Sequence, residues 1–234
     1  MRRREFLRGA AVPAVAAADG RPRRAAAQSQ VPERQVPEGM DLPKPQTQGG
    51  RPLMAALSDR KTERNISEEK LSSQMLSNLL WAAWGVNRPA TRGRTAPSGM
   101  NAQEINLYVF LERGIYLYDG PSHSLKPILA GDYRATTGSQ AQVGRAPASL
   151  VFVADFDKYN AGGGRGISDA AMQLACSNAH AGFIAQNVYL FAASEGLASW
   201  FRAMLDAPAL SKLLSLRPAE KVLYSQGVGY PAKA

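Results

Sequence analysis

The chain has 234 residues, of which 45% are hydrophobic and 20% are charged. This length allows one or two domains, and the apolar fraction is large enough to bury a core, which excludes a wholly disordered chain. A single cysteine excludes a fold stapled by disulfides within the chain. The formal net charge of +9 would suit binding to nucleic acid or to an anionic membrane, so the distribution of that charge matters.

Much of the charge lies at the N-terminus, where residues 1–27 hold seven arginines and two acidic residues. Residues 3–8 read Arg-Arg-Glu-Phe-Leu-Arg and precede an apolar run, residues 9–18, that is too short to span a bilayer. This order resembles a twin-arginine export signal, and the alanines at 25–27 suit a signal peptidase. A basic tail that binds an acidic partner is the alternative. We expect residues 1–27 to be a signal peptide and the protein to be periplasmic or otherwise exported.

The next segment, residues 28–50, is rich in Gln, Pro and Gly and predicts an extended arm. Residues 51–234 predict a single α+β domain. Pro52 should begin a short helix that runs to Ser58. Ser67 is the predicted N-cap of a second helix, which carries an apolar stripe and ends near Gly85.

Several later segments predict strands, helices and loops in alternation. Residues 88–100 predict a loop. Residues 106–111 and 114–118 alternate between apolar and polar and predict a β-hairpin. Residues 149–154 form an apolar run typical of a buried central strand. The remaining predictions are a helical stretch around residues 134–143, a loop over the glycine-rich residues 160–166, a helix over residues 205–214 and a final strand over residues 222–230.

The segment from Ala170 to Ser194 has no charged residue. Amide, hydroxyl and imidazole side chains within it argue against a transmembrane helix and against stable membrane insertion. It predicts the buried central helix of a soluble fold. Small or narrow side chains recur on one side of this helix, where another backbone could come close: Ala171, Ala175, Ala179, Gly182 and Gln186.

Other common sites are not indicated by the sequence. It has no phosphate loop and no nucleophile elbow, and residues 160–166 miss the third glycine of a dinucleotide-binding turn. His123, His180 and Cys176 do not stand at metal-ligand spacing, so no metal site is predicted. The arginines of residues 88–94 have few aromatic neighbours, so no nucleic-acid surface is predicted.

The segment Arg60-Lys61-Thr62-Glu63-Arg64 has the composition of a phosphate grip, because arginine offers paired donors and threonine a further one. A solvated basic turn is the alternative for this segment alone. A second motif supports the phosphate grip. It spans residues 97–103, Pro-Ser-Gly-Met-Asn-Ala-Gln, and leads into a predicted strand.

These two motifs, in this order, resemble those of the nitroreductase family of FMN flavoproteins, in particular the branch that includes peptide-azoline dehydrogenases. The uncharged helix, which ends in Gly196-Leu197, and the closing residues 228–231, Val-Gly-Tyr-Pro, also resemble the family. The resemblance implies a central, mostly antiparallel sheet flanked by helices. It also implies an intertwined homodimer with FMN at the subunit interface. The implied activity is transfer of hydride or electrons from a reductant, NAD(P)H in much of the family, to a small organic acceptor such as a nitro compound or quinone.

The resemblance also assigns site residues. Arg60, Thr62 and Arg64 would hold the FMN phosphate, and Lys61 would add backbone or ribityl contacts. A backbone N–H near flavin N5, that of Ala203, would come from the segment that ends at Met204. The remaining flavin contacts would come from Pro97, Ser98, Gly99, Asn101 and Gln140. The resemblance assigns no catalytic acid or base.

Two further functions remain open. The protein could oxidise an azoline ring in a peptide, but the branch that does so uses a Lys-Tyr pair, which spacing alone does not place here. It could also be a non-catalytic flavin-binding module. Because NAD(P)H is scarce outside the cytoplasm, an exported enzyme would take electrons from a quinol or a protein.

Overall fold

A computed structural model describes residues 35–160 and 166–233, which belong to one unit of the chain, Arg34–Ala234. Its centre is a seven-stranded sheet in the order β1-β6-β5-β4-β7-β9-β8, and each neighbouring pair is antiparallel. The strands of this sheet are β1 (Met40–Asp41), β4 (Ile105–Leu111), β5 (Gly114–Asp119), β6 (Ser124–Ala130), β7 (Ala148–Asp155), β8 (Ala198–Arg202) and β9 (Glu220–Gly229). The predicted α+β class with an antiparallel sheet is confirmed.

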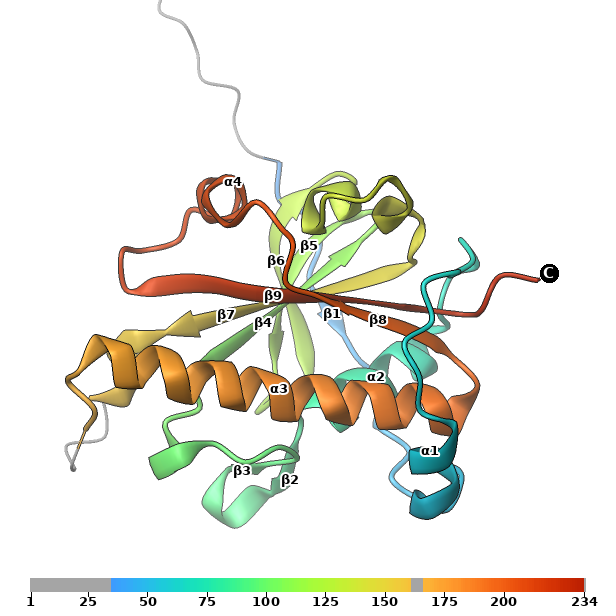
Figure 1. The fold of residues 1–234 in the computed structure, drawn as a ribbon, viewed down its shortest axis with the longest axis horizontal. Coiled ribbons are helices and arrows are strands. Elements are labelled where there is room, and N and C mark those ends of the chain that lie inside the picture. Colours follow the sequence, from blue (N-terminus) through green and yellow to red (C-terminus); the bar gives the residue numbers. More distant parts are fainter. Residues whose placement is uncertain (1–34, 161–165, 234) are drawn as a thin grey trace, which may run out of the picture. The chain divides into compact units, whose positions relative to one another are not determined.

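Four helices cover the two faces of this sheet (Figure 1). Three of them, α1, α2 and α3, lie on one face, and α4 lies on the other. Their bounds are Leu53–Asp59 (α1), Ser73–Trp84 (α2), Ala170–Glu195 (α3) and Ala207–Leu213 (α4). The predicted signal peptide, residues 1–27, and residues 161–165 of the predicted glycine-rich loop lie outside the described residues.

The hairpin of β4 and β5 follows from its alternating sequence and its two-residue turn. Leu111 pairs with Gly114 across that turn, as predicted. Every residue of β7 is buried, which the apolar run predicted, because β7 lies inside the sheet between β4 and β9. Local sequence patterns were therefore sufficient to locate β4, β5 and β7.

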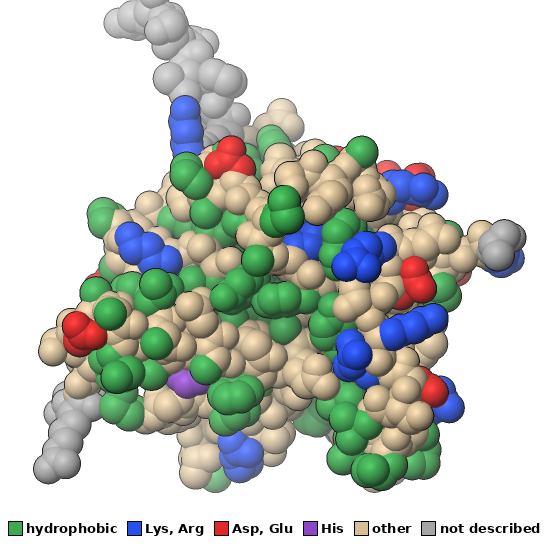
Figure 2. All heavy atoms as spheres, in the orientation of Figure 1, with side chains coloured by type: hydrophobic (Ala, Val, Ile, Leu, Met, Phe, Trp, Pro, Cys, Tyr) green, Lys and Arg blue, Asp and Glu red, His purple; other side chains and the backbone are tan. Residues whose placement is uncertain are grey.

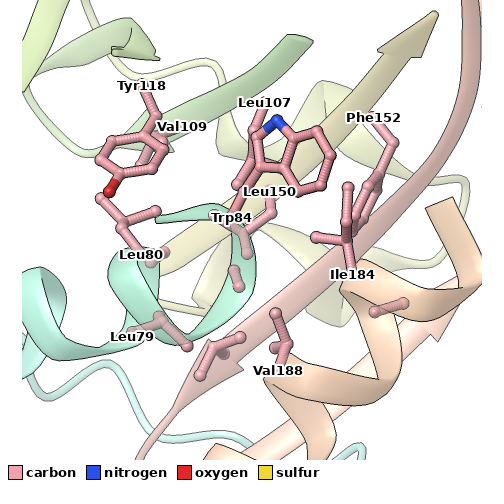
Figure 3. Packing of buried hydrophobic residues seen from close by; sticks show 14 of the residues in the cluster. Leu79, Leu80, Trp84, Leu107, Val109, Tyr118, Leu150, Phe152, Ile184 and Val188 are labelled. Atoms are coloured by element: carbon pink, nitrogen blue, oxygen red, sulfur yellow. The ribbon is translucent and has the colours of Figure 1, made fainter. Parts of the chain in front are cut away.

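The larger hydrophobic core fills the space between the sheet and helices α2 and α3 (Figure 3). Trp84 of α2 lies at its centre, and its indole N–H donates a hydrogen bond to the Ile105 carbonyl at 3.0 Å. Ile184 and Val188 of α3 are fully buried against the same cluster. A second cluster, on the opposite face, packs Leu210 of α4 against the sheet.

The predicted N-cap of α2 was wrong. Ser72 caps the helix and accepts a hydrogen bond from the Met75 N–H at 3.1 Å. Ser67 remains in extended chain because its N–H donates to the Tyr230 carbonyl at 2.8 Å and Ile66 pairs with Pro231. These contacts with the C-terminal end of the chain override the local helix signal.

Helix α3 is the uncharged segment, and its capping is local. Asp169 caps its start by accepting from the Met172 N–H at 2.7 Å, and Gly196 ends it with a φ of 71°. Only one side of the helix is buried. The predicted burial of this helix holds for that side alone in a single chain, and the predicted small-residue side is exposed: Ala171, Ala175, Ala179, Gly182 and Gln186.

Some elements carried no recognisable signal. Strand β6 contains Lys126 and Pro127, and β8 has only five residues. The short strand β1 lies within the segment expected to be an arm. A small hairpin, β2 (Val86–Arg88) with β3 (Gly93–Arg94), occupies part of the predicted loop. The predicted helical stretch around residues 134–143 consists of two short 3-10 turns, Arg134–Thr137 and Ala141–Arg145.

None of the helices in the described ranges is long and apolar enough to cross a membrane. The same residues contain no group of three or more His, Cys, Asp or Glu side chains that could hold a metal ion.

Candidate functional site

The basic segment 60–64 runs in extended conformation from the end of α1 along the outer edge of β8. The Glu63 N–H donates to the Ser199 carbonyl at 3.0 Å, which ties the segment to β8. Side chains alternate along an extended chain, so Arg60, Thr62 and Arg64 face one way and Lys61 faces the other. The predicted phosphate residues thus lie together, while Lys61 and Glu63 line a separate cavity of about 240 Å³.

Two aromatic rings support the arginines of this segment. The Arg60 guanidinium lies 5.4 Å from the centre of the Tyr189 ring, and the Tyr189 hydroxyl lies 3.0 Å from Thr62 Oγ1. The Arg64 guanidinium lies 5.6 Å from the centre of the Trp200 ring. Such stacking orients a guanidinium without using its N–H donors.

Neither Arg60 nor Arg64 forms an ion pair with any residue in the described ranges. Lys61, in contrast, pairs with Glu63 at 3.7 Å. Lys and Arg side chains gather over this side of the molecule, between α1 and the end of β8 (Figure 2). Oriented guanidinium groups without counter-charges form a surface that suits a phosphate group.

Strand β8 connects this surface to the predicted flavin segment, which ends at Met204. The Trp200 ring contacts both Arg64 and Arg202. The Arg202 guanidinium lies 5.0 Å from the centre of that ring. Ala203 and Met204 follow directly, in extended chain outside the sheet. The Met204 side chain is 68% exposed, so the segment is open to a ligand.

Gln140 lies on the segment that packs against Arg202. Arg202 Nη2 donates to Thr137 Oγ1 at 3.2 Å, and a Cβ added at Gly138 would lie 3.1 Å from Arg202 Nε. The side-chain oxygen Oε1 of Gln140 is buried without a hydrogen-bond partner among the described residues. An orphaned buried acceptor is costly in an empty site and fits a donor from a bound group.

The second predicted motif lies elsewhere on the chain, against the N-terminal half of α3. The Gly99 N–H donates to His180 Nε2 at 2.9 Å. His180 precedes Tyr189 by nine positions on α3, which corresponds to about 14 Å along the helix. One chain therefore does not bring Pro97, Ser98, Gly99 and Asn101 to the phosphate residues.

The loop that carries this motif, residues 97–103, has a strained backbone. Met100, Asn101 and Gln103 all have positive φ angles, of 54°, 53° and 49°. Left-handed residues other than glycine cost about 1 to 2 kcal/mol each and persist only where surrounding contacts hold them. Gln103 supplies several of these contacts, since its N–H donates to Ser98 Oγ and its amide nitrogen to Asn101 Oδ1, both at 2.8 Å.

A buried His-Glu pair, which the sequence did not single out, anchors the loop to α3. His180 Nε2 accepts from the Gly99 N–H, so Nδ1 must carry the proton that is donated to Glu104 Oε1 at 2.7 Å. Glu104 is fully buried and also accepts from Ser98 Oγ at 3.2 Å. Burial raises the pKa of Glu104, but the hydrogen bond from His180 brings the pKa below its ordinary 4.5.

A Lys-Tyr pair lies beside the same loop, although spacing alone had placed none. Lys158 Nζ lies 2.6 Å from Asn106 Oδ1 and 3.4 Å from the Gln103 carbonyl. The Tyr159 hydroxyl lies 3.0 Å from Ser177 Oγ on α3. Burial lowers the pKa of Lys158 and raises that of Tyr159. Lys158 and Tyr159 are consecutive in the sequence, and this dipeptide is the feature from which the pair could have been predicted.

Known proteins match this chain over most of its length. The model of the nitroreductase family matches residues 57–230. A nitroreductase-like protein of Methanocaldococcus jannaschii is 31% identical over 157 residues, which cover 62% of this chain and 75% of that protein.

Solved structures show the same relationship. A nitroreductase-like protein from Ralstonia eutropha JMP134 has 39% identity and a TM-score of 0.77, covering 84% of this chain and 90% of that one. An NADPH:FMN oxidoreductase from Vibrio harveyi shares the fold, with a TM-score of 0.58 and 18% identity over 77% of this chain and 69% of that one. The chain therefore belongs to the nitroreductase family and is an oxidoreductase of the flavin-dependent type.

Proposed function

We propose that this protein binds FMN and transfers hydride or electrons from a reductant to a small organic acceptor, such as a nitro compound or a quinone. The observation that carries the proposal is the pair of oriented arginines, Arg60 and Arg64. They have no counter-charge among the described residues and stack on rings beside β8, which leads to the exposed Met204. When bound, the flavin would supply the redox chemistry by accepting and releasing hydride at N5.

The residues of this chain would bind and orient that group. Arg60, Thr62 and Arg64 would hold the phosphate, since their donors lie on one side of an extended segment. Gln140 would offer its buried oxygen to a ring N–H, and the backbone at Ala203 would offer an N–H. The neighbouring Met204 would cover part of the ring, because it is exposed.

The distance between the two motifs supports a homodimer. The loop of residues 97–101 contacts α3 about 14 Å along the helix from the phosphate residues of its own chain, and we infer that a second subunit supplies it. The exposed side of α3 suits the contact, since it is uncharged and carries the exposed apolar side chains of Leu174 and Phe183 beside Gly182. Docking two such helices would place each loop near the other subunit's arginines.

Export is part of the proposal and rests on residues 1–27. Outside the cytoplasm a quinol or a reduced protein would replace NAD(P)H as the electron donor. Steady-state turnover of a nitro compound and a quinone tests the function, with NADPH and a reduced quinol compared as donors. We expect turnover with one donor at least. Failure of every donor to reduce the bound flavin would contradict the proposal and favour a non-catalytic flavin-binding module.

A second candidate, oxidation of a peptide azoline ring, is favoured by Lys158 and Tyr159. The branch that catalyses this reaction uses such a pair, and here Lys158 lies beside the strained loop while the adjacent Tyr159 contacts Ser177 of α3. Lys158→Met and Tyr159→Phe separate the two functions. Loss of azoline oxidation, with flavin reduction by the donor unchanged, would support the second candidate. Unchanged rates for a nitro acceptor, together with no azoline activity in the wild type, would support the first.

A further inference from the structure

Arg202, the last residue of β8, is a cation buried without a counter-charge. Arg202 is 4% exposed and forms no ion pair with the described part of the chain. Its partners are two hydroxyls, because Nε donates to Ser225 Oγ at 3.0 Å and Nη2 to Thr137 Oγ1 at 3.2 Å. Nη1 has no partner among the described residues. Burying a charge in this way costs free energy, so the arrangement needs a reason.

The surroundings hold the guanidinium in one place. The Ser225 hydroxyl donates to the Thr137 carbonyl at 2.5 Å, and the Thr137 hydroxyl donates to the Arg134 carbonyl at 2.8 Å. Each hydroxyl has therefore used its proton and turns a lone pair to Arg202. The Trp200 ring covers one side of the group. These contacts fix the position of the charge.

Gly227 of β9 provides the space for Nη1. It pairs with Trp200 across the two strands, and a Cβ added at Gly227 would lie 3.0 Å from Arg202 Nη1. That distance is tighter than nine in ten real Cβ contacts, so a side chain here would require the guanidinium tip to shift by a few tenths of an ångström. The glycine thus permits the close approach of strand and cation.

The charge lies at the proposed flavin site but is enclosed. Arg202 directly precedes Ala203, and it shares the Trp200 ring with Arg64. Burial lowers the pKa of Arg202 to about 10, which leaves it protonated at neutral pH. A substrate carboxylate has no access to an enclosed guanidinium, so the charge must act over a distance. Its field is weakly screened because protein, not water, surrounds it.

We propose that Arg202 raises the reduction potential of the bound flavin through its fixed positive charge. This inference rests on the proposed function. Uptake of two electrons and one proton from a reductant adds one negative charge to the flavin ring. A buried cation beside that ring favours the reduced form over the oxidised form, and the difference in affinity between the two forms appears as a higher potential. A purely structural role, in which Arg202 only links the Ser225 and Thr137 hydroxyls, would not require a positive charge.

The test compares the midpoint potential of FMN bound to the wild type, Arg202→Met and Arg202→Lys, with Arg113→Met as control. Arg113 also stacks on an aromatic ring, Tyr116, at 5.8 Å, but it lies outside the proposed site. We expect Arg202→Met to lose about tenfold of the preference for reduced flavin, which lowers a two-electron potential by about 30 mV. Arg202→Lys should retain most of the wild-type potential, and the affinity for oxidised FMN should change less than threefold.

A wild-type potential in Arg202→Met with FMN still bound would overturn the inference. If Arg202→Met does not unfold cooperatively, Arg202→Gln replaces it, because an amide keeps a donor for the two hydroxyls while the charge is removed. A lowered potential in Arg202→Gln and an unchanged one in Arg202→Lys would support the inference, and equal potentials in all variants would overturn it. A wild-type protein that takes up no FMN would instead overturn the proposed function and this inference together.

Discussion

At the scale of single residues, the arginines of the site differ in how they are held. Arg60 and Arg64 stack on aromatic rings at the surface and form no ion pair with the described residues, whereas the Arg202 guanidinium is buried against two hydroxyls. The first two were predictable, because they stand two positions from Thr62 in a short motif. Arg202 and the His180–Glu104 pair were not, since their partners come from distant segments whose meeting no spacing rule describes.

The phosphate role of the surface arginines predicts a loss of FMN affinity. Hydrogen bonds to charged groups contribute about 1.5 to 3 kcal/mol each, and each 1.4 kcal/mol is a factor of ten in affinity. Arg60→Met or Arg64→Met should therefore weaken FMN binding at least about tenfold, measured by quenching of FMN fluorescence. Arg113→Met is the matched control and should bind FMN as the wild type does. Equal affinity in all three variants would refute the phosphate role.

The buried pair predicts a pH dependence of stability. The pKa of Glu104 is below 4.5 in the folded protein, so its contribution to stability is complete above pH 4.5 and is lost as the pH falls through the folded value. Glu104→Gln keeps the shape and the acceptor for His180 but removes the charge. Urea unfolding should show the variant about 1 kcal/mol less stable at pH 7, because charge-assisted hydrogen bonds are about twice as strong as neutral ones. This difference should shrink below pH 4.5, and a constant difference would contradict the assignment.

At the scale of elements, local patterns located the hairpin of β4 and β5, the buried strand β7 and the helix α3. Each has a periodicity or an apolar run that its neighbours do not disturb. Strand β6 was missed because Pro127 interrupts its pattern, and the start of α2 was misplaced because Ser67 is bound by Tyr230. Pairing with a distant strand decides both cases, and no local window contains that information.

The exposed side of α3 predicts a dimer that can be disrupted at one glycine. In a single chain a Cβ added at Gly182 meets nothing within 4 Å, and replacing a helical glycine by a better helix former stabilises the helix by about 1 kcal/mol. Gly182→Leu should thus be harmless to a monomer but should separate two closely packed helices. Sedimentation analysis should show a dimer for the wild type and a monomer with weakened FMN binding for the variant.

Ala209→Leu is the control for this experiment, because Ala209 is an exposed residue of α4 on the opposite face of the sheet (Figure 1). It should remain dimeric. A Gly182→Leu protein that stays dimeric and binds FMN normally would show that α3 does not form the interface.

At the scale of the whole molecule, the net charge divides between the proposed signal peptide and the rest of the chain. Since residues 1–27 hold seven arginines and two acidic residues, their removal lowers the formal net charge from +9 to +4. Part of the remainder is the group of Arg60, Arg64 and Arg202. The sequence predicted the family and the antiparallel sheet, but it could not show that one chain holds the two motifs apart. That separation depends on where each motif meets α3.

The export proposal predicts the fate of the full chain in a cell. Replacing both Arg3 and Arg4 by Lys should retain the protein in the cytoplasm, because the twin-arginine route requires the arginine pair. Cell fractionation followed by immunoblotting checks this, with the wild-type chain expected in the periplasm and shortened near residue 27. A wild-type chain that stays cytoplasmic and intact would favour the basic-tail alternative.

The visible absorption spectrum of the purified protein tests the central claim most directly. The surface of Arg60, Thr62 and Arg64 predicts a yellow protein whose flavin peaks persist through gel filtration at about one FMN per chain and fade on addition of a reductant. The released chromophore should be FMN rather than riboflavin, because the site is built around a phosphate. A colourless protein that takes up no FMN when it is added would contradict the account.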